Sequence, residues 1–274
     1  MFFPVLISIN LKEKIEMEAL SVVIITYNEE KNIGRCLDSV SRVADEVIVL
    51  DSYSSDDTVN IAKQKGALVK QQEFNGYKEQ KNLALRLCTH DFVLSLDADE
   101  SLSEQLIQSI TEAKQEFRFK AYTMNRCNHY CGRFIRRGLW YPDRKLRLFN
   151  KNIAHWGGIN PHDKIELSES TEVFHLNGDI LHYAYDSVEE HIQRNEQLSS
   201  IAAQSLYESG KKQYWIKIIS SPIWAFFNGY VLRLGFLDGL CGYEIAIYTA
   251  QQTFLKYSKF FRLQKQQQPI ENYN

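Results

Sequence analysis

Two aspartates, Asp97 and Asp99, follow directly on the apolar segment 92–96 of this 274-residue chain. Unpaired carboxylates this close together repel each other, so a cation is expected beside them. A few hard oxygen ligands suit Mg²⁺ or Mn²⁺ that is held jointly with a phosphate-bearing substrate. The alternative is a solvated turn that caps a following helix at Ser103. The pair therefore predicts either a metal site or a helix cap.

Polar residues follow two earlier apolar segments in the same way. Segment 21–25 is followed by Thr26, Tyr27, Asn28 and Glu29, and segment 46–50 is followed by Asp51. A buried Asp51 can accept a hydrogen bond from an N–H group of a base, and Tyr27 can stack on that base. An Asx turn and ordinary packing are the alternatives.

These residues depend on strands and helices that alternate along the first 120 residues. The pattern predicts strands over 21–26, 46–50, 67–70 and 92–96, and helices over 29–41, 56–66, 77–88 and 103–116. Such alternation predicts a parallel sheet with right-handed crossovers. Ligands of such sheets bind beyond the carboxyl ends of the strands, which is where the polar residues stand. A glycine-rich dinucleotide fingerprint and a GxxxxGK[ST] loop are both absent from the sequence.

The remaining chain has a different pattern. We expect strands over 120–126 and 145–149, an irregular segment over 152–165, and helices over 188–207, 215–234 and 237–261. This gives an N-terminal extension (1–19), an α/β domain (20–185), a helical region (186–263) and a disordered tail (264–274). The apolar run 2–9 lacks a basic leader and a cleavage site, so it is not predicted to be a signal peptide.

Composition and charge exclude some classes of protein. A net charge of −2 argues against a general nucleic-acid binder. That value hides a segment, 126–151, with eight basic residues and one acidic residue. Five cysteines, an odd and small number, fit a reducing compartment. Cys127, His129 and Cys131 fall on one face of a strand, so they are either zinc ligands or buried thiols beside a histidine.

Four segments in this order are similar to those of the family 2 inverting glycosyltransferases, which have a GT-A fold. They read VVIITYNEEKNIGRCLDSV, EVIVLDSYSSDDT, QKNLAL and FVLSLDADE. Three further segments resemble the lipopolysaccharide core β-1,4-glucosyltransferases of bacteria: RKLRLFN, Pro161-His162-Asp163 and GFLDGLCGYEIAIYTAQQTFLKYSK. The resemblance implies an α/β, Rossmann-like and mostly parallel sheet with helices on both faces, plus a C-terminal helical region. Residues 20–118 would hold the nucleotide-sugar and 119–185 the acceptor.

The resemblance also implies roles for individual residues on the donor side. Asp51 matches the carboxylate that reads uracil, Lys81 a position near the diphosphate, Asp97 a position near ribose and sugar, and Asp99 the metal ligand. The nucleotide pocket would be lined by Thr26, Tyr27, Asn28 and Glu29.

On the acceptor side, the resemblance implies that Asp163 is the general base. His162-Asp163 stands where this branch often has His-Glu, and His162 would bind the metal, orient the base or serve as an ordinary loop histidine. The implied reaction transfers a hexose, glucose in the narrower branch, from a UDP-sugar to a heptose of a lipopolysaccharide inner-core acceptor, with Mg²⁺ or Mn²⁺. The alternatives are another UDP-sugar or acceptor, a phosphotransferase or phosphohydrolase that uses Asp97 as nucleophile, and a membrane-surface binding module without catalysis.

Basic and aromatic residues alternate in the 126–151 segment. Arg144 and Arg147 there suit an anionic sugar acceptor; RNA binding and a charged loop that is balanced by the acidic segment 163–208 are the alternatives. The apolar helices after residue 211, flanked by lysines, suit either a peripheral anchor on the cytoplasmic face of the inner membrane or a helical lid. A lipid-linked oligosaccharide acceptor favours the anchor. The oligomeric state is not predicted.

Overall fold

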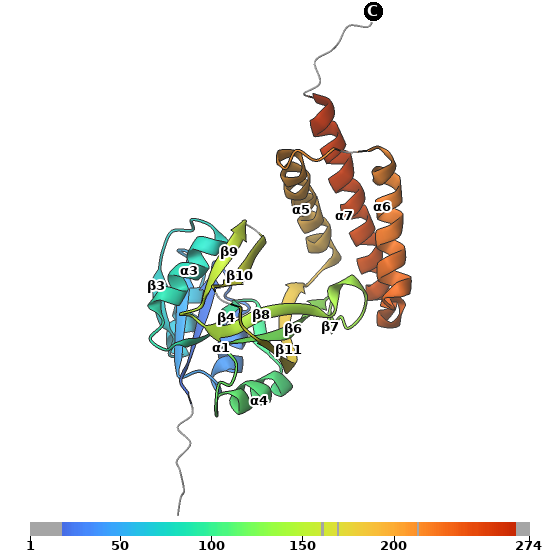
Figure 1. The fold of residues 1–274 in the computed structure, drawn as a ribbon. Helices are drawn as coiled ribbons and strands as arrows, with labels where there is room; N and C mark the ends of the chain where they lie inside the picture. The colour runs from blue at the N-terminus through green and yellow to red at the C-terminus, as the bar shows by residue number, and fades with distance from the viewer. Residues whose placement is uncertain (1–17, 160–161, 169, 213, 267–274) are drawn as a thin grey trace, which may run out of the picture.

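The computed structural model describes residues 18–159, 162–168, 170–212 and 214–266. Within them, a nine-stranded sheet carries helices on both faces, and three long helices rise from one end of it (Figure 1). The strand order is β3 (Leu68–Gln71), β2 (Glu46–Asp51), β1 (Leu20–Thr26), β4 (Phe92–Asp97), β8 (Asp143–Asn150), β6 (Ala121–Tyr130), β11 (Val173–Tyr185) and β5 (Glu100–Leu102), with the short β7 (Arg133–Phe134) beside β6. The molecule therefore has an α/β part and a C-terminal helical part.

The N-terminal half of the sheet is parallel, as predicted. β1 pairs in parallel with β2 and β4, and β2 pairs in parallel with β3. Thr26 is opposite Asp51 and Ile25 is opposite Asp97, so the carboxyl ends of three strands meet at one edge. The elements of this half are β1 (Leu20–Thr26), α1 (Ile33–Val40), β2 (Glu46–Asp51), α2 (Thr58–Gln64), β3 (Leu68–Gln71), α3 (Tyr77–Leu87), β4 (Phe92–Asp97) and α4 (Glu104–Ala113).

The other half of the sheet is mixed. β8 (Asp143–Asn150) runs antiparallel to both β4 and β6 (Ala121–Tyr130), and β11 (Val173–Tyr185) runs parallel to β6. β5 (Glu100–Leu102), β7 (Arg133–Phe134) and β11 were not predicted from the sequence. The register of β11 shifts between His175 and Asp179, next to Gly178, and this interruption hides the strand from a pattern of strict alternation.

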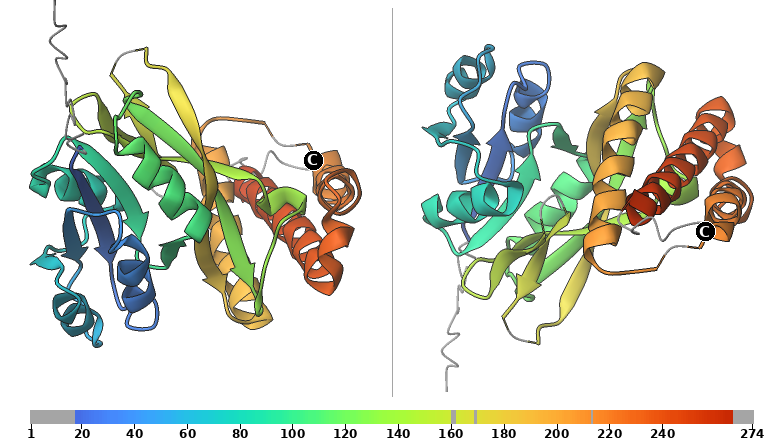
Figure 2. Two further views of the ribbon diagram at one scale, coloured as in Figure 1. Left: turned by 90° about the horizontal axis from the view of Figure 1, so that it is seen from below. Right: turned by 90° about the horizontal axis from the view of Figure 1, so that it is seen from above.

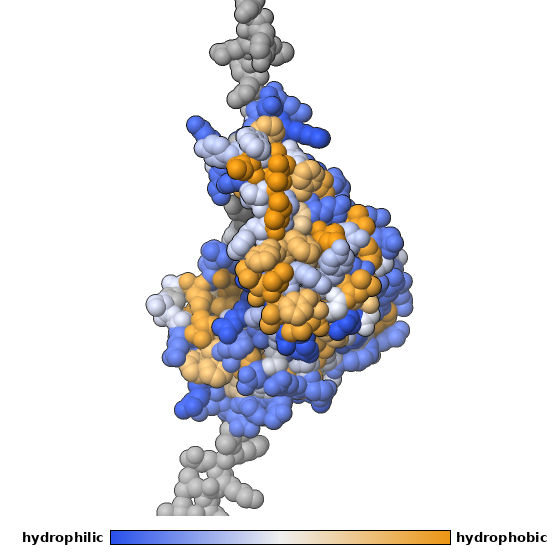
Figure 3. Space-filling view, turned by 90° about the vertical axis from the view of Figure 1, so that its right-hand side faces the viewer, coloured by the Kyte–Doolittle hydropathy of each residue, from blue (hydrophilic) through white to orange (hydrophobic). Residues whose placement is uncertain are grey.

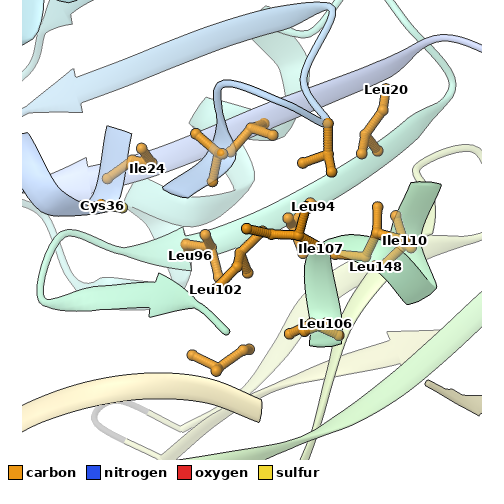
Figure 4. Packing of buried hydrophobic residues seen from close by; sticks show 14 of the residues in the cluster. Leu20, Ile24, Cys36, Leu94, Leu96, Leu102, Leu106, Ile107, Ile110 and Leu148 are labelled. Carbon is orange, nitrogen blue, oxygen red and sulfur yellow. The ribbon is translucent and has the colours of Figure 1, made fainter. Parts of the chain in front are cut away.

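Two hydrophobic layers hold the sheet. Side chains of β1 alternate between them: Val22 and Ile24 face α1 and α4, while Val23 faces α3. Figure 4 shows the first layer, in which Leu94 and Leu96 of β4 lie beside Leu106, Ile107 and Ile110 of α4. Helix α1 contributes Ile33, Cys36, Leu37 and Val40 to the first layer, and their spacing places them on one face of the helix. Packing on both faces fixes the end of β4, and with it Asp97.

The prediction of an irregular segment over 152–165 is wrong. It forms a hairpin of β9 (Ala154–Ile159) and β10 (His162–Leu167), with Trp156 opposite Ile165. A Cβ at Gly157 would collide with the side chain of Glu166. The glycine therefore makes room for a side chain of the neighbouring strand and does not end the pairing.

The C-terminal helices pack around α7 (Gly239–Gln266), which contacts both α5 (Val188–Glu208) and α6 (Ile216–Phe227). Both views in Figure 2 show the three helices grouped at the β6–β11 end of the sheet. A Cβ at Gly242 would lie 1.9 Å from the carbonyl oxygen of Gly235, so only glycine permits this close turn. The prediction of a disordered tail is wrong for residues 264–266, because helix α7 continues to Gln266. The rest of the predicted tail, 267–274, and residues 1–17 lie outside the described part of the chain.

Helix α6 has no buried residue, although it is strongly apolar. Exposed fractions are 65% for Ile223, 58% for Trp224 and 70% for Leu240 of α7. Figure 3 shows apolar side chains gathered on this face of the molecule. None of the described helices is both long enough and apolar enough to cross a membrane.

Candidate active site

Lys81 joins two of the carboxylates that the sequence singled out. Its Nζ lies 3.1 Å from Oδ1 of Asp97 and 2.9 Å from Oδ2 of Asp163. The three residues come from α3, the end of β4 and strand β10, and the side chain of Lys81 is only 6% exposed. The structure therefore brings together a candidate sugar-binding aspartate, the candidate base and the candidate diphosphate-binding lysine.

Arg147 of β8 holds the other oxygen of Asp97. Its Nη2 donates to Asp97 Oδ2 at 3.0 Å and to Oε1 of the buried Glu100 at 3.2 Å. Burial alone would raise the pKa of Asp97, but the charges of Arg147 and Lys81 outweigh it and hold that pKa well below its usual range. Burial would likewise lower the pKa of Arg147, but Glu100 and Asp97 raise it. Both groups are therefore charged at neutral pH.

Buried polar atoms without a partner gather at this cluster. Among the described residues, five buried side-chain atoms lack a hydrogen-bond partner, and two of them, Arg147 Nη1 and Trp156 Nε1, belong to this cluster. The Trp156 ring lies 4.3 Å from Lys81 Nζ. Because buried polar groups normally have partners, atoms like these indicate a place where a polar ligand binds.

Asp99 has a different neighbour from Asp97. His182 of β11 places Nε2 3.2 Å from Asp99 Oδ2, and its Nδ1 lies 2.6 Å from Oδ1 of Asn128. When Nδ1–H donates to Asn128, Nε2 is free to bind a cation. The charge of Asp99 adds to the effect of burial, which is the main cause that raises the pKa of nearby Glu29.

The Asp99–His182 pair fits a divalent cation. Groups of three or more His, Cys, Asp or Glu side chains that could hold a metal are absent among the described residues. One carboxylate and one imidazole suit a cation that takes its other ligands from substrate phosphates and water. Sequence reasoning missed His182 because no strand was predicted there; the expected ligand, His162, lies on β10, and its side chain is outside the described part.

The loops after β1 and β2 are tied to each other. Asn28 has a left-handed backbone conformation, with a φ of 54°. Its side-chain Oδ1 accepts a hydrogen bond from the backbone N–H of Ser55, and its backbone N–H donates to Ser54 Oγ. Asp51 is fully buried and accepts from the Ser54 amide and from Gln71. Asp51 therefore shapes the loop in the structure as it stands.

Two tyrosines flank these loops. Tyr27 is 60% exposed and Tyr53, which sequence reasoning did not single out, is 56% exposed. Tyr53 also has a positive φ of 61°, and it follows β2 where Tyr27 follows β1. Either ring is available to stack on a base.

Several of the basic residues of 126–151 are paired inside the protein. At least four of the eight form ion pairs with carboxylates: Arg126, Arg136, Lys145 and Arg147. Arg144 is exposed on β8, near His175, and no contact among the described residues joins it to the Asp97 cluster. Among these described ion pairs, only Arg136–Asp179 reaches the acidic segment 163–208 that was expected to balance the loop; the other partners are Asp97, Glu100 and Asp143.

The zinc alternative is not supported by the arrangement of its three residues. Cys127 is buried, and its Sγ contacts the carbonyl of Ile135 at 3.3 Å. Burial raises the pKa of that thiol to about 11, so it stays protonated at neutral pH. His129 packs against the rings of Phe134 and Tyr183. Within the described part of the chain, Cys127 and His129 therefore make packing contacts, and neither belongs to a metal-binding cluster.

Known proteins and a family profile with sequences similar to this chain are glycosyltransferases. The sequence profile of glycosyl transferase family 2 matches residues 21–167. An uncharacterized glycosyltransferase of Rickettsia typhi is 35% identical over 257 residues, which cover 90% of this chain and 88% of that protein. The lipopolysaccharide core biosynthesis glycosyltransferase LpsC of Rhizobium meliloti is 27% identical, covering 89% of this chain and 92% of its own.

Solved structures are more distant. Glucosyl-3-phosphoglycerate synthase of Mycobacterium tuberculosis, in complex with Mn²⁺, UDP and glucosyl-3-phosphoglycerate, is 26% identical over 41% of this chain and 44% of its own, with a TM-score of 0.35. TarS of S. aureus is 16% identical over 93% of this chain and 56% of its own, with a TM-score of 0.47. Both TM-scores are below 0.5, so neither likeness supports an inference about this chain.

Proposed function

The chain belongs to glycosyl transferase family 2 and has a GT-A fold with a C-terminal helical region, and on that premise we propose that it is an inverting hexosyltransferase. The donor is a UDP-sugar, with glucose as the first candidate, and the acceptor is a lipid-linked oligosaccharide of the lipopolysaccharide inner core, with heptose as the accepting sugar. The observation that carries the proposal is the cluster in which Lys81 lies between Asp97 and Asp163, beside buried polar atoms without partners.

The donor would bind along the carboxyl edge of β1, β2 and β4. Tyr27 stacks on the uracil, and the ammonium of Lys81 and the unpartnered Nη1 of Arg147 attract the diphosphate. Asp99 and His182 would hold Mg²⁺ or Mn²⁺, which when bound would offset the charge of the leaving UDP. Asp51 contributes to uracil recognition through the loop it supports.

Asp163 is the proposed base. Its carboxylate takes the proton of an acceptor hydroxyl while that oxygen bonds to the anomeric carbon, and the bond from this carbon to the diphosphate oxygen breaks with its electron pair going to UDP. Attack on the face opposite UDP converts an α-linked donor into a β product. In this structure the ammonium group of Lys81 is paired with the carboxylate of Asp163. We expect the donor diphosphate to attract the Lys81 ammonium away from Asp163 before Asp163 acts as the base.

The exposed apolar face supports a peripheral place on the cytoplasmic side of the inner membrane. Aromatic and aliphatic side chains of α6 and α7 are exposed, and lysines flank them at Lys211, Lys212, Lys217, Lys256 and Lys265. Interfacial helices combine these two features. Flotation with anionic vesicles tests this: Ile219→Asp with Ile223→Asp should abolish it, while Leu68→Asp with Phe74→Asp, which changes two apolar side chains that are 50% exposed elsewhere, should not. Equal flotation of both double variants would refute the anchor.

The alternative phosphotransfer reaction has no supporting observation. It needs a carboxylate oxygen of Asp97 as a free nucleophile, but one oxygen contacts Lys81 and the other contacts Arg147. Calorimetry with Mn²⁺ and a panel of UDP, GDP, CDP and dTDP tests the donor assignment. We expect UDP to bind at least tenfold more tightly than the others; comparable binding of all four, or of none, would contradict a UDP-sugar donor.

A further inference from the structure

A cavity of about 360 Å³ lies between the sheet and the C-terminal helices. Its walls come from β6, β8 and β11 on one side and from α5 and α7 on the other. His182 and Asn128 belong to its lining, and His182 contacts Asp99. The cavity therefore adjoins the proposed donor site on the side of the helices.

The lining is polar in part, and the opposite charges of its arginine and its aspartate are paired. Arg126 Nη2 is 2.9 Å from Asp143 Oδ2, so the two opposite charges of the wall are paired with each other. His191 is neutral at pH 7, because burial lowers its pKa to about 4. Asn128, Asn195 and Gln252 add amides to the polar wall, Thr249 adds a hydroxyl and His182 adds an imidazole. This chemistry suits a ligand with many hydroxyl groups and no net charge.

Aromatic rings supply the apolar part of the wall. Trp140 and Tyr185 are stacked on each other, with ring centroids 5.7 Å apart, and both are half-buried. Both line the cavity. Fixed aromatic surfaces beside hydroxyl-binding amides match the two sides of a sugar ring, which has C–H groups on its faces and hydroxyls at its edge.

A second, apolar cavity adjoins the first. It measures about 870 Å³, lies between α6 and α7, and shares Leu139 and Thr249 with the polar cavity. Trp224 and Phe227 line it and also belong to the exposed apolar face. A ligand that extends through both cavities must have an apolar part attached to its sugar.

We propose that the two cavities together bind the acceptor: an uncharged sugar ring in the polar cavity, next to His182, and its apolar aglycone in the cavity between α6 and α7. The inference rests on the proposed transferase function and sharpens it. The basic residues Arg144 and Arg147 were expected to face an anionic acceptor sugar, but neither lines the polar cavity. The sugar that receives the hexose is accordingly neutral.

The test uses three simple glycosides below their micelle-forming concentrations, with the full chain, UDP and Mn²⁺. Binding of methyl β-glucoside, octyl β-glucoside and octyl β-glucuronide is measured by calorimetry and by saturation-transfer NMR. Octyl glucoside should bind at least tenfold more tightly than methyl glucoside, and the charged glucuronide at least tenfold more weakly than octyl glucoside. Equal binding of the two octyl compounds would overturn the uncharged sugar site. Equal binding of the methyl and octyl glucosides would overturn the aglycone site.

Two variants locate the binding. Gln252→Leu should weaken both glucosides several-fold, whereas Gln251→Leu, its exposed neighbour outside the cavity, should leave them unchanged. Ser221→Trp, which fills the apolar cavity, should weaken octyl glucoside and spare methyl glucoside. Identical effects of the two glutamine variants would place the sugar elsewhere. UDP binding in the same samples separates the outcomes: glycosides that fail to bind while UDP binds contradict this inference alone, and failure of UDP contradicts the proposed function.

Discussion

Lys81 Nζ lies 2.9 Å from a carboxylate oxygen of Asp163, although the two residues are 82 positions apart in the chain. The pair joins α3 to the β9–β10 hairpin across the edge of the sheet. The same ammonium group contacts Asp97 at the end of β4. A lysine that would bind the donor diphosphate thus also holds the proposed base, which links donor binding to base activation.

Replacing Asp163 tests its role as the base. Asp163→Asn keeps the size of the side chain and removes the proton acceptor, so turnover should fall at least about 100-fold. UDP binding, measured by calorimetry, should remain within a few-fold of that of the unchanged protein. The matched control is Lys164→Gln, an exposed neighbour on the same strand, which should leave turnover unchanged. Near-normal turnover of Asp163→Asn would show that another group is the base.

His182 is predicted to make UDP binding dependent on the metal. His182→Ala should lower the Mn²⁺-dependent part of the UDP affinity by about tenfold or more, and UDP affinity in EDTA should not change. His155→Ala, which removes an imidazole that is 59% exposed on β9, is the control. If Mn²⁺ strengthens UDP binding equally in both variants, His182 is not a metal ligand.

Arg147 is predicted to matter for stability as well as for the site. It is buried between Asp97 and Glu100, so Arg147→Met leaves two carboxylates without their shared cation and should lower the free energy of unfolding by about 3 kcal/mol or more. Arg144→Met changes an exposed arginine on the same strand and should cost less than about 0.5 kcal/mol. Urea denaturation of both variants measures this difference, and equal costs would contradict the arrangement.

His191 should make the helical junction sensitive to acid. Burial among Tyr130, Trp140, Tyr185 and Tyr248 lowers its pKa to about 4, below the ordinary value of 6.5. Between these values the unfolded chain binds the proton and the folded chain does not, so stability is full above about pH 6.5 and falls as the pH drops toward 4. The loss should be on the order of 3 kcal/mol.

The variant His191→Phe lacks the titrating group and should lose less stability over the same pH range. Unfolding free energies at pH 7 and pH 4.5 compare the two proteins, and NMR titration gives the pKa of His191 directly. A titration near pH 6.5 would show that the imidazole is solvated.

The sequence predicted those parts of the fold that have a local signal. The apolar runs of β1, β2 and β4 are buried on both faces, and such runs stand out in a sequence. Ser103 does cap α4, since its hydroxyl accepts from the Leu106 amide, and Gly66 ends α2 with a φ of 82°. These features depend only on neighbouring residues.

Features that depend on distant residues were missed. β11 pairs with β6 across about fifty positions, and its half-exposed sequence alternates poorly. His182 was missed because it lies on this strand. Asp97 and Asp99 read as one motif, but only the tertiary structure gives them separate partners, Lys81 with Arg147 for the first and His182 for the second. Local pattern cannot carry that information.

The most direct test of the account is the product itself. The purified chain is incubated with Mn²⁺, radiolabelled UDP-sugars and membrane glycolipids from a Gram-negative bacterium, and the anomeric configuration of the transferred sugar is determined by NMR. We expect label from an α-linked UDP-hexose to enter the glycolipid as a β-glycoside, and Asp163→Asn to give no labelled product. An α-linked product, or equal labelling by Asp163→Asn, would contradict inverting transfer with Asp163 as the base.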